Sequence, residues 1–361
     1  MPGIDDVIAA ETVLSDVDGA NGRLIVRGLP VEELARNGTA ESVAHLLFEG
    51  FFPDLPDERG LARAIGTARR HAFQRLEPHL PAIAALSPVE ALRAGLSFIP
   101  DGDDLYTALM LSGAAAVLTP AIIRFNGGQQ AIAPDPKIGQ SADMIRMTSG
   151  APASQAEERA LNAYLATVSE HGLNASTFAA RIAASTKAGL GSAVIAGLSA
   201  LKGPLHGGAP GPVLDMLHEI GEASRAEAWL IQALARGDRL MGFGHRIYKV
   251  RDPRADALKS AVKALARAGG APNRLTLAEA VEQAALDILH KTKPNRPLET
   301  NVEFYTAVLL DALGFPADSF TSIFATARII GWIAHAREQE MNGRLIRPQS
   351  RYVGPVPKQA A

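Results

Sequence analysis

The chain of 361 residues is 47% hydrophobic and 20% charged, contains no cysteine and carries a formal net charge of −2 at pH 7. The small net charge argues against nucleic acid or an anionic membrane as the main partner, and the missing cysteines exclude disulfides, thiolate metal sites and cysteine nucleophiles. The length allows more than one lobe, because a single hydrophobic core stops growing at roughly 250–300 residues.

The sequence predicts neither a signal peptide nor a membrane-spanning helix. Residues Met1–Glu11 lack the basic region and the apolar region of a signal peptide. The most apolar stretch, Ala114–Phe125, is interrupted by Pro120 and is far shorter than the roughly 20 residues that a membrane span needs. We therefore expect a cytoplasmic protein.

The first predicted element is a β hairpin. Residues Thr12–Val17 and Arg23–Arg27 flank Asp18–Gly22, which is rich in turn-forming residues. No other segment shows sustained alternation of β-branched residues, and strands do not alternate with helices as they do in a parallel sheet. The remainder is predicted to be helical, which gives an all-α fold with a minor N-terminal hairpin.

Capping boxes predict three helix starts, each followed by apolar residues at helical spacing. They lie at Ser87–Glu90, where Pro88 takes the first helical position, at Ser154–Glu157 and at Thr276–Glu279. Glycines predict helix ends at Gly50, Gly172, Gly221 and Gly269–Gly270.

Four segments combine histidine or acidic residues with patterns that are unusual inside a helix. They are residues 170–177, 203–208, 242–246 and 301–305. Glycine and proline in two of them allow the backbone to approach a ligand closely. An isolated histidine is more often structural or solvent-facing than catalytic, and we interpret six in that way: His45, His71, His79, His218, His290 and His335.

Arginines near these segments favour an anionic small molecule as ligand. Arg254 follows His245 by nine residues, and Arg328 and Arg347 lie near the C-terminus. Planar guanidinium groups bind carboxylates bidentately, so a group of them beside histidines suits a di- or tricarboxylate. The sequence has no Walker A, H-E-x-x-H or G-x-S-x-G motif, so hydrolysis of nucleotide triphosphates, zinc hydrolysis and serine hydrolysis lack support.

Taken together, these motifs resemble the citrate synthase family, including its 2-methylcitrate synthase members. The resemblance runs from Val7 to Pro355. It is carried by KGPLHGG at 202–208, by GFGHR at 242–246 followed by DPRA, and by IRP and RYVGP near the C-terminus. Their shared order and spacing make a chance agreement very improbable.

The resemblance implies a two-domain helical fold in a homodimer. Residues 1–206 with 316–361 would form the large, dimer-forming domain, and residues 207–315 a small domain that closes over the active site. The implied reaction condenses acetyl-CoA with oxaloacetate and hydrolyses citryl-CoA to citrate and CoA, with no metal and no further cofactor. Two alternatives stay open: a 2-methylcitrate synthase that uses propionyl-CoA, and a regulatory relative without catalysis.

The resemblance also implies roles for individual residues. His206 would act on the thioester, His245 on the ketone of oxaloacetate, and Glu303 as the general base. Residues matched to oxaloacetate or citrate binding are His171, His245, Arg254, Arg328 and Arg347, the last contributed across the dimer interface. Residues matched to CoA binding are Gly242, Phe243, Gly244, Arg246 and Lys249.

The chain departs from the common family pattern at two positions. The usual residue at Glu303 is Asp, although one branch of the family carries the same Asn-Val-Glu-Phe sequence. The longer side chain requires a backbone set further back or an altered geometry, since a misplacement of about 1 Å can cost about 100-fold in rate. Pro210 replaces an Asn that is not needed for the chemistry.

Overall fold

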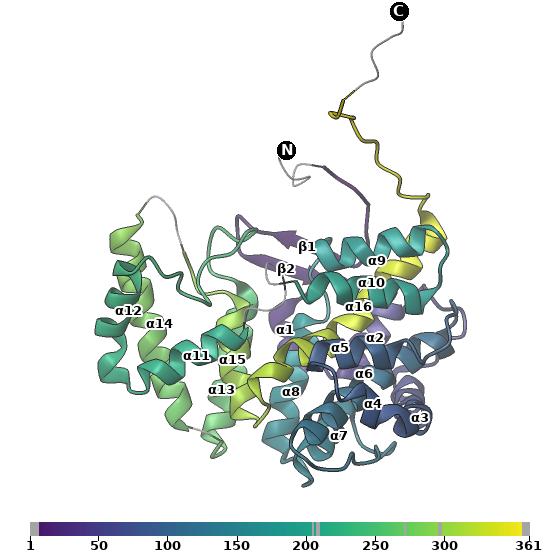
Figure 1. Ribbon diagram of the computed structural model, residues 1–361, viewed down its shortest axis with the longest axis horizontal. Coiled ribbons are helices and arrows are strands. Elements are labelled where there is room, and N and C mark those ends of the chain that lie inside the picture. Colours follow the sequence, from purple (N-terminus) through teal and green to yellow (C-terminus); the bar gives the residue numbers. More distant parts are fainter. Residues whose placement is uncertain (1–6, 204–205, 207–209, 271, 295–297, 356–361) are drawn as a thin grey trace, which may run out of the picture.

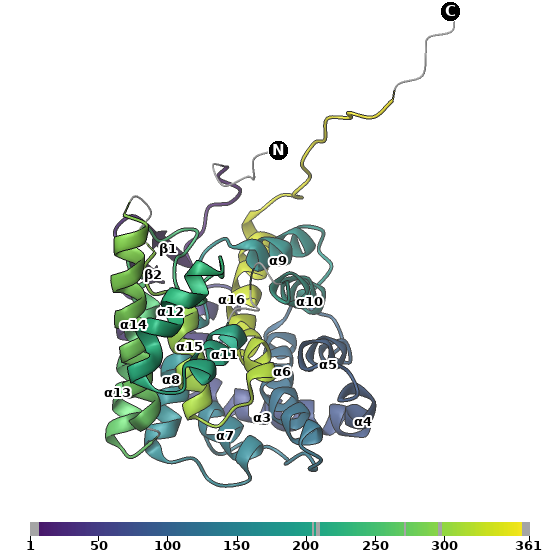
Figure 2. The same cartoon turned by 60° about the vertical axis from the view of Figure 1, so that its left-hand side comes forward.

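The computed structural model describes residues 7–203, 206, 210–270, 272–294 and 298–355, and these are mostly helical (Figures 1 and 2). The predicted all-α fold with a small β element is confirmed. The helices fall into two groups in Figure 1, with the larger group on the right.

The N-terminal hairpin forms where the sequence predicts it. Its strands are β1 (Ser15–Asp18) and β2 (Arg23–Val26), paired antiparallel with Ser15 opposite Val26. A third strand, β3 (Leu29–Pro30), extends the sheet on the far side of β2. The prediction missed β3 because two residues are too short to show an alternating pattern.

The larger group contains the hydrophobic core around the long helices. Its elements are α1 (Val31–Asn37), α2 (Ala40–Phe48), α3 (Glu58–Leu76), η1 (Glu77–His79), α4 (Leu80–Ile83), α5 (Pro88–Leu96), α6 (Leu105–Asn126), α7 (Gln140–Ser149), α8 (Gln155–Val168), α9 (Ala175–Ser185), α10 (Leu190–Leu201), η3 (Ala317–Ser319) and α16 (Phe320–Asn342). Helix α16 packs against α6, α8, α9 and α10, and both views show it running through the middle of the molecule.

Helix α6 corrects the expectation that Pro120 interrupts its apolar stretch. The helix is 22 residues long and runs without a break through Pro120 to Asn126. Within the described part of the chain it alone is long and apolar enough to cross a membrane, yet 83% of its apolar window is buried inside the fold. It packs against α3, α5, α7 and α16, so burial of its whole circumference stabilises the helix despite the missing proline N–H.

The smaller group, on the left of Figure 1, carries much of the predicted site. Its elements are α11 (Pro210–Ile220), η2 (Ala223–Arg225), α12 (Ala226–Ala235), α13 (Pro253–Arg267), α14 (Pro272–Thr292) and α15 (Val302–Ala312). Helix α13 packs on α15 and also on α1 and α8, which connects the two groups. The division at residues 207 and 315 stays a prediction, and residue 207 itself lies outside the described residues.

The three predicted capping boxes have different outcomes. At Ser154 the box is present, with Ser154 Oγ accepting from Glu157 N and Glu157 Oε2 accepting from Ser154 N at 2.7 Å. At Ser87 the box is absent, because the hydroxyl donates to Glu90 Oε2 at 2.6 Å. The predicted start at Thr276 is wrong: α14 begins at Pro272, and this Thr-x-x-Glu spacing lies inside the helix.

Glycines follow the helix ends closely at three of the four predicted places. Positive φ angles follow α2 at Gly50 (79°), α11 at Gly221 (71°) and α13 at Gly269 (95°). Gly172, with φ 61°, lies four residues after α8 and turns the chain toward α9. Side chains with a Cβ rarely adopt this conformation, so glycine is the natural residue there.

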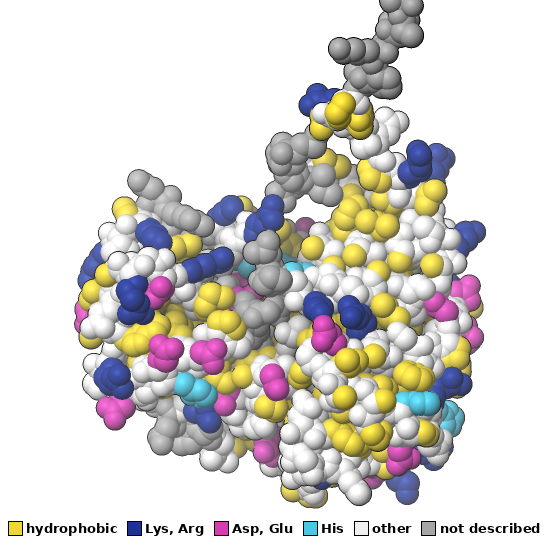
Figure 3. Space-filling view, viewed as in Figure 1, with side chains coloured by type: hydrophobic (Ala, Val, Ile, Leu, Met, Phe, Trp, Pro, Cys, Tyr) yellow, Lys and Arg dark blue, Asp and Glu magenta, His cyan; other side chains and the backbone are white. Residues whose placement is uncertain are grey.

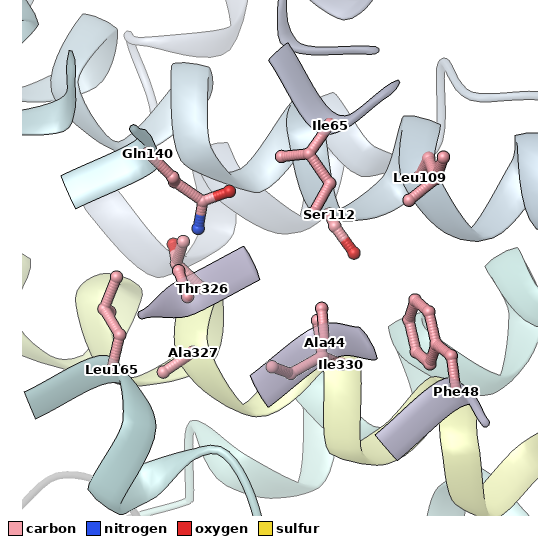
Figure 4. Close-up of a pocket in the computed structure, with 11 residues that line it drawn as sticks. Ala44, Phe48, Ile65, Leu109, Ser112, Gln140, Leu165, Thr326, Ala327 and Ile330 are labelled. Carbon is pink, nitrogen blue, oxygen red and sulfur yellow. The ribbon is translucent and has the colours of Figure 1, made fainter. Parts of the chain in front are cut away.

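A small closed cavity lies inside the larger group (Figure 4). It is lined by Ala40, Ala44, Phe48, Ile65, Leu109, Ser112, Gln140, Leu165, Thr326, Ala327 and Ile330. Its volume of about 10 Å³ is close to the minimum that one water molecule needs. It is therefore a packing defect of the core and has no room for a substrate.

We predict that Ser154→Ala lowers the free energy of unfolding by about 1 kcal/mol, because α8 loses its N-cap acceptor. Ser87→Ala is the matched control, since the Ser87 hydroxyl bonds a side chain and caps no helix N–H. We expect a smaller loss for the control. Urea unfolding midpoints measure both variants, and equal losses would contradict the capping interpretation.

Candidate active site

Backbone pairing brings His245 and Glu303 to the same place. Gly244 N donates to Glu299 O at 2.7 Å, Asn301 N donates to Gly242 O at 3.0 Å, and Phe243 forms a β-bridge with Thr300. Gly242 and Gly244 have φ angles of 85° and 84°, which few other residues adopt. On one side this short pairing ends directly before His245 and its loop. On the other side it ends directly before α15, which has Glu303 in its first turn.

The buried carboxylate of Asp252 connects α13 to α15. Its Oδ1 accepts from Arg254 N and Arg254 Nε, both at 3.0 Å, and its Oδ2 accepts from Arg254 Nη2 at 2.8 Å and from Val302 N at 3.1 Å. Burial acts to lower the pKa of Arg254, but Asp252 outweighs it and the pKa is raised. Arg254 is thus a fixed cation between the two helix N-termini.

Hydrogen bonds determine which nitrogen of His245 carries the proton. Its Nδ1 accepts from the backbone N–H groups of Ile247 and Tyr248, both at 3.1 Å, so in the neutral ring the proton is on Nε2. Burial, followed by the Arg254 charge, lowers the pKa of His245 to about 4. Arg254 Nη2 lies 3.4 Å from this Nε2, and both nitrogens are donors that can bind one shared oxygen.

His171 and Tyr248 complete this side of the site. His171 is buried, and its ring centroid lies 5.8 Å from that of His245. Its Nε2 lies 3.1 Å from the hydroxyl of Tyr248. Burial, then the charges of Arg254 and Arg328, lower the pKa of His171 well below its ordinary value. The sequence interpretation missed Tyr248, although its position three residues after His245 in a glycine-flanked loop was a usable signal.

Arg328 presents a buried guanidinium nitrogen to the same region. Its Nε donates to Val168 O at 2.7 Å, while its Nη2 is buried with no hydrogen-bond partner among the described residues. Burial lowers the pKa of Arg328 to about 10, Glu170 opposes the shift and Arg254 adds to it. A buried N–H donor without a partner is costly, so this nitrogen favours an anionic ligand.

His206 is held by Ser176. The Ser176 hydroxyl lies 2.7 Å from Asn174 Oδ1, which also accepts two backbone N–H groups and is therefore an acceptor. Ser176 Oγ must then accept from His206 Nε2 at 2.9 Å, as it does from Trp332 Nε1 at 3.2 Å. Burial, followed by the Arg328 charge, lowers the pKa of His206 to about 4, so the ring is neutral.

Glu303 differs from the histidines in the direction of its pKa shift. Burial disfavours its charged form and raises its pKa to about 7, against the opposing charges of Arg254 and Arg239. Its backbone N–H donates to Asn301 Oδ1 at 3.0 Å, which caps α15. A carboxylate with a pKa near neutrality is a stronger base than an ordinary one and suits proton transfer.

A basic cleft adjoins His245. Its volume is about 730 Å³, and it is lined by residues of the 237–249 segment together with α12, α14 and Leu298. The predicted CoA-binding residues Phe243, Gly244, Arg246 and Lys249 line it, together with Arg239 and Lys293, which the sequence interpretation missed. Gly242 is not part of the lining and packs on Phe304 instead. Figure 3 shows several Lys and Arg side chains on this group of helices, interspersed with acidic ones.

Buried ionic residues behind His171 were also missed. His335 Nδ1 lies 2.8 Å from Arg181 Nη1, which only donates, so the His335 proton is on Nε2 and points to Glu170 Oε1 at 3.0 Å. Arg181 Nη1 also donates to Glu338 Oε2 at 2.6 Å. The sequence interpretation of His335 as structural agrees with this arrangement, but its partners lie more than 150 positions away in sequence and no local pattern indicates them.

Arg347 lies apart from this cluster, and part of the segment around His206 is not described. Arg347 is exposed in the extended segment that leaves the body after α16, and it makes no hydrogen bond or ion pair with described residues (Figure 1). In the segment around His206, residues 204–205 and 207–209 lie outside the described residues, and for Pro210 only its backbone place at the start of α11 is described.

Comparisons with known proteins agree on one family. The family model described as "Citrate synthase, C-terminal domain" matches residues 3–349. The citrate/2-methylcitrate synthase of Bacillus subtilis is 35% identical over 98% of this chain and 96% of that protein. The citrate synthase structure from Thermotoga maritima has a TM-score of 0.84 and 34% identity, and covers 99% of this chain and 97% of that chain.

A further solved structure, from Thermoplasma acidophilum, is a citrate synthase in a ternary complex with carboxymethyl coenzyme A and oxaloacetate. Its TM-score is 0.87 at 28% identity, with 99% of this chain and 97% of that chain covered.

We predict that His206 and His245 stay neutral near pH 7 and gain a proton only as the pH falls toward about 4. Burial and the nearby arginines disfavour the charged ring in both cases. Nitrogen NMR of histidine-labelled protein measures this, with His206→Gln and His245→Gln variants to assign the signals. A His245 that carries its proton on Nδ1, or titrates at its ordinary value, would contradict the geometry.

Proposed function

This chain belongs to the citrate synthase family of acyltransferases, and we propose that it condenses acetyl-CoA with oxaloacetate and releases citrate and CoA. The observation that carries the proposal is the convergence of two neutral histidine donors, two buried arginines and one carboxylate whose pKa is raised toward neutrality. Such a set binds an oxo-dicarboxylate and can also remove a weakly acidic proton.

Oxaloacetate supplies two carboxylates and a ketone. Arg254 and the unpartnered Nη2 of Arg328 suit the carboxylates, since guanidinium groups bind carboxylates through charge-assisted hydrogen bonds. The Nε2–H of His245 suits the ketone oxygen and stabilises the negative charge that grows there during attack. His171, neutral and beside His245, provides a further ring nitrogen for the same substrate.

The thioester half of the reaction needs a base and a hydrogen-bond donor. Glu303 takes a proton from the methyl group of acetyl-CoA, while an N–H of His206 stabilises the thioester oxygen as the enol forms. If the Ser176 hydroxyl turns away from Asn174, it can donate to His206 Nε2. That nitrogen is then the acceptor, so the ring proton is on Nδ1, which donates to the thioester oxygen. The Ser176 hydroxyl thereby decides which ring nitrogen is the donor.

The remaining steps follow from the enol. Its carbon attacks the ketone carbon and a carbon–carbon bond forms, while the enol oxygen gives up its proton and becomes the thioester carbonyl again. The ketone oxygen takes the Nε2 proton of His245, which gives citryl-CoA. Water then attacks the thioester carbonyl, CoA leaves as the thiol, and citrate is released. The cleft lined by Phe243, Arg246, Lys249, Arg239 and Lys293 suits CoA, because an apolar wall with several cations matches a nucleotide with phosphates.

Propionyl-CoA is the second candidate thioester, supported by the name of the Bacillus subtilis relative. One methylene in a pocket is worth only about 1–3 kcal/mol, so the two activities require small differences in the pocket.

We also propose a homodimer in which Arg347 serves the partner's site. Figure 3 shows apolar side chains over the region of α5, α9 and α10, and Ile182 on α9 is 40% exposed. A second copy would cover such a face. Arg347 is exposed on a segment that leaves the body of its own chain, which suits a role in another subunit.

We predict that the protein releases free CoA thiol when mixed with oxaloacetate and acetyl-CoA. Glu303→Gln should lower kcat about 100- to 10,000-fold, because the amide cannot accept the proton. Glu279→Gln is the matched control, since Glu279 pairs with Lys263 on the surface of the same group of helices. A thiol-reactive dye measures the rate, and kcat/KM for acetyl- and propionyl-CoA decides the preferred thioester.

No thiol release with either thioester would leave the regulatory relative as the better description. A Glu303→Gln variant, or a Glu303→Ala variant, as active as the parent would show that another group is the base.

We predict that two inactive variants complement each other. Arg347→Ala and Glu303→Gln homodimers should each be inactive. In a mixed dimer, the subunit with Arg347→Ala keeps its own Glu303 and receives Arg347 from its partner, so one site of two recovers. Activity after the two are unfolded together and refolded measures this. If Arg347 instead serves its own subunit, the mixed dimer stays inactive.

A further inference from the structure

The N-terminal hairpin contacts both histidine segments of the site. On strand β1, the Ser15 hydroxyl donates to Glu170 Oε1 at 2.8 Å, directly before His171 in sequence. A Cβ added at Gly172 would lie 3.0 Å from Val17 Cγ2, so β1 packs tightly against the turn that follows His171. Glu170 Oε1 also accepts from Gly172 N at 2.6 Å, which makes the turn and the strand one hydrogen-bonded unit.

The tip of the same hairpin contacts the loop that carries His245. Lys249 N donates to Gly19 O at 2.9 Å. A Cβ at Gly19 would collide with the carbonyl oxygen of Ile247, and one at Gly22 would lie 2.8 Å from Val250 Cγ2. Only the absence of a side chain at Gly19 and at Gly22 allows this approach.

The loop has little regular structure of its own, so it is held by this contact and by the buried Tyr248, which bonds to His171. Residues 242–244 are held by the pairing with residues 299–301, but residues 246–250 are in no helix or strand. Ile247 and Val250 are 49% and 41% exposed, so core packing holds them weakly. The His245 ring is in turn fixed by the backbone N–H groups of Ile247 and Tyr248, at the point where the hairpin tip is seated.

We propose that the hairpin is a positioning element for oxaloacetate, with Ser15 and Gly19 as its two attachment points. Ser15 attaches it to the His171 turn, and Gly19 attaches it to the His245 loop. The hairpin therefore sets the separation of two histidines that come from different groups of helices. This inference rests on the proposed function, because it assigns both histidines to one oxaloacetate molecule.

Oxaloacetate binding should be sensitive to the hairpin because it depends on the exact placement of both histidines. Groups that bind one small substrate must be placed to within a fraction of an ångström, and a displacement of about 1 Å can cost about 100-fold. Paired strands with a defined register are stiffer than the loop, so the hairpin transfers rigidity from the larger group to residues 246–250.

The test compares Gly19, at the hairpin tip, with Gly28, between β2 and β3, by calorimetric binding of oxaloacetate. Gly19 has no positive φ, so Gly19→Ala changes only the contact with the His245 loop. We expect its dissociation constant for oxaloacetate to rise about 10- to 100-fold. Gly28→Ala is the matched control: its Cβ meets nothing within 4 Å, but its φ of 85° makes alanine strained. The control should lower the melting temperature and leave the dissociation constant unchanged.

The other attachment point provides a rescue. Ser15→Ala should weaken oxaloacetate binding, and Ser15→Thr, which keeps the hydroxyl for Glu170, should restore it. Circular dichroism confirms that each variant is folded.

Each outcome decides one question. A Gly19→Ala variant that binds oxaloacetate like the parent overturns the proposal, and so does an equal weakening in Gly28→Ala, which would show general loss of hairpin stability. Ser15→Thr that binds no better than Ser15→Ala also overturns it. A parent protein that binds no oxaloacetate refutes the proposed function itself, and the inference with it.

Discussion

The site depends on one buried carboxylate, that of Asp252. It accepts hydrogen bonds from the first turns of α13 and α15 and from the guanidinium of Arg254. Two helix N-termini and a cation would repel one another if they were brought together in a dry site. The Asp252 charge makes their approach favourable, and it thereby places Arg254 beside Glu303 and His245.

Burial then acts in opposite directions on the two kinds of titrating group. It lowers the pKa of His206 and His245 to about 4 and raises that of Glu303 to about 7, because in each case the charged form loses its hydration. The arginines deepen the shift of the histidines and oppose that of Glu303. The histidines are therefore neutral N–H donors near neutral pH, and the formal positive charge of the site lies on Arg254 and Arg328, which suits a dianionic ligand.

The sequence predicted those features that local patterns encode. The hairpin was visible because Asp18–Gly22 is turn-rich, and the capping box at Ser154 was correct. The Thr276 start was wrong because the same spacing occurs inside a helix, and Pro120 failed to break α6 because burial on all sides outweighs one lost hydrogen bond. The convergence of the site residues was predicted only through the family resemblance. Tyr248 and the partners of His335 were missed, since buried polar pairing depends on contacts between distant segments.

The pattern of attachments determines which residues can move together. His245, Arg254 and Glu303 are joined through Asp252 and through the pairing of residues 242–244 with 299–301, so they form one rigid unit. His171 and Arg328 belong to the other group of helices, where Arg328 Nε bonds Val168 O. A rotation of one group against the other would therefore separate two half-sites, and it would also break the bond between His171 and Tyr248 and disturb the packing of α13 on α1 and α8. The sheet of the hairpin packs on α1 of the larger group, and its tip contacts the loop of the smaller group, so such a rotation must break the contact of Gly19 with residues 247–249.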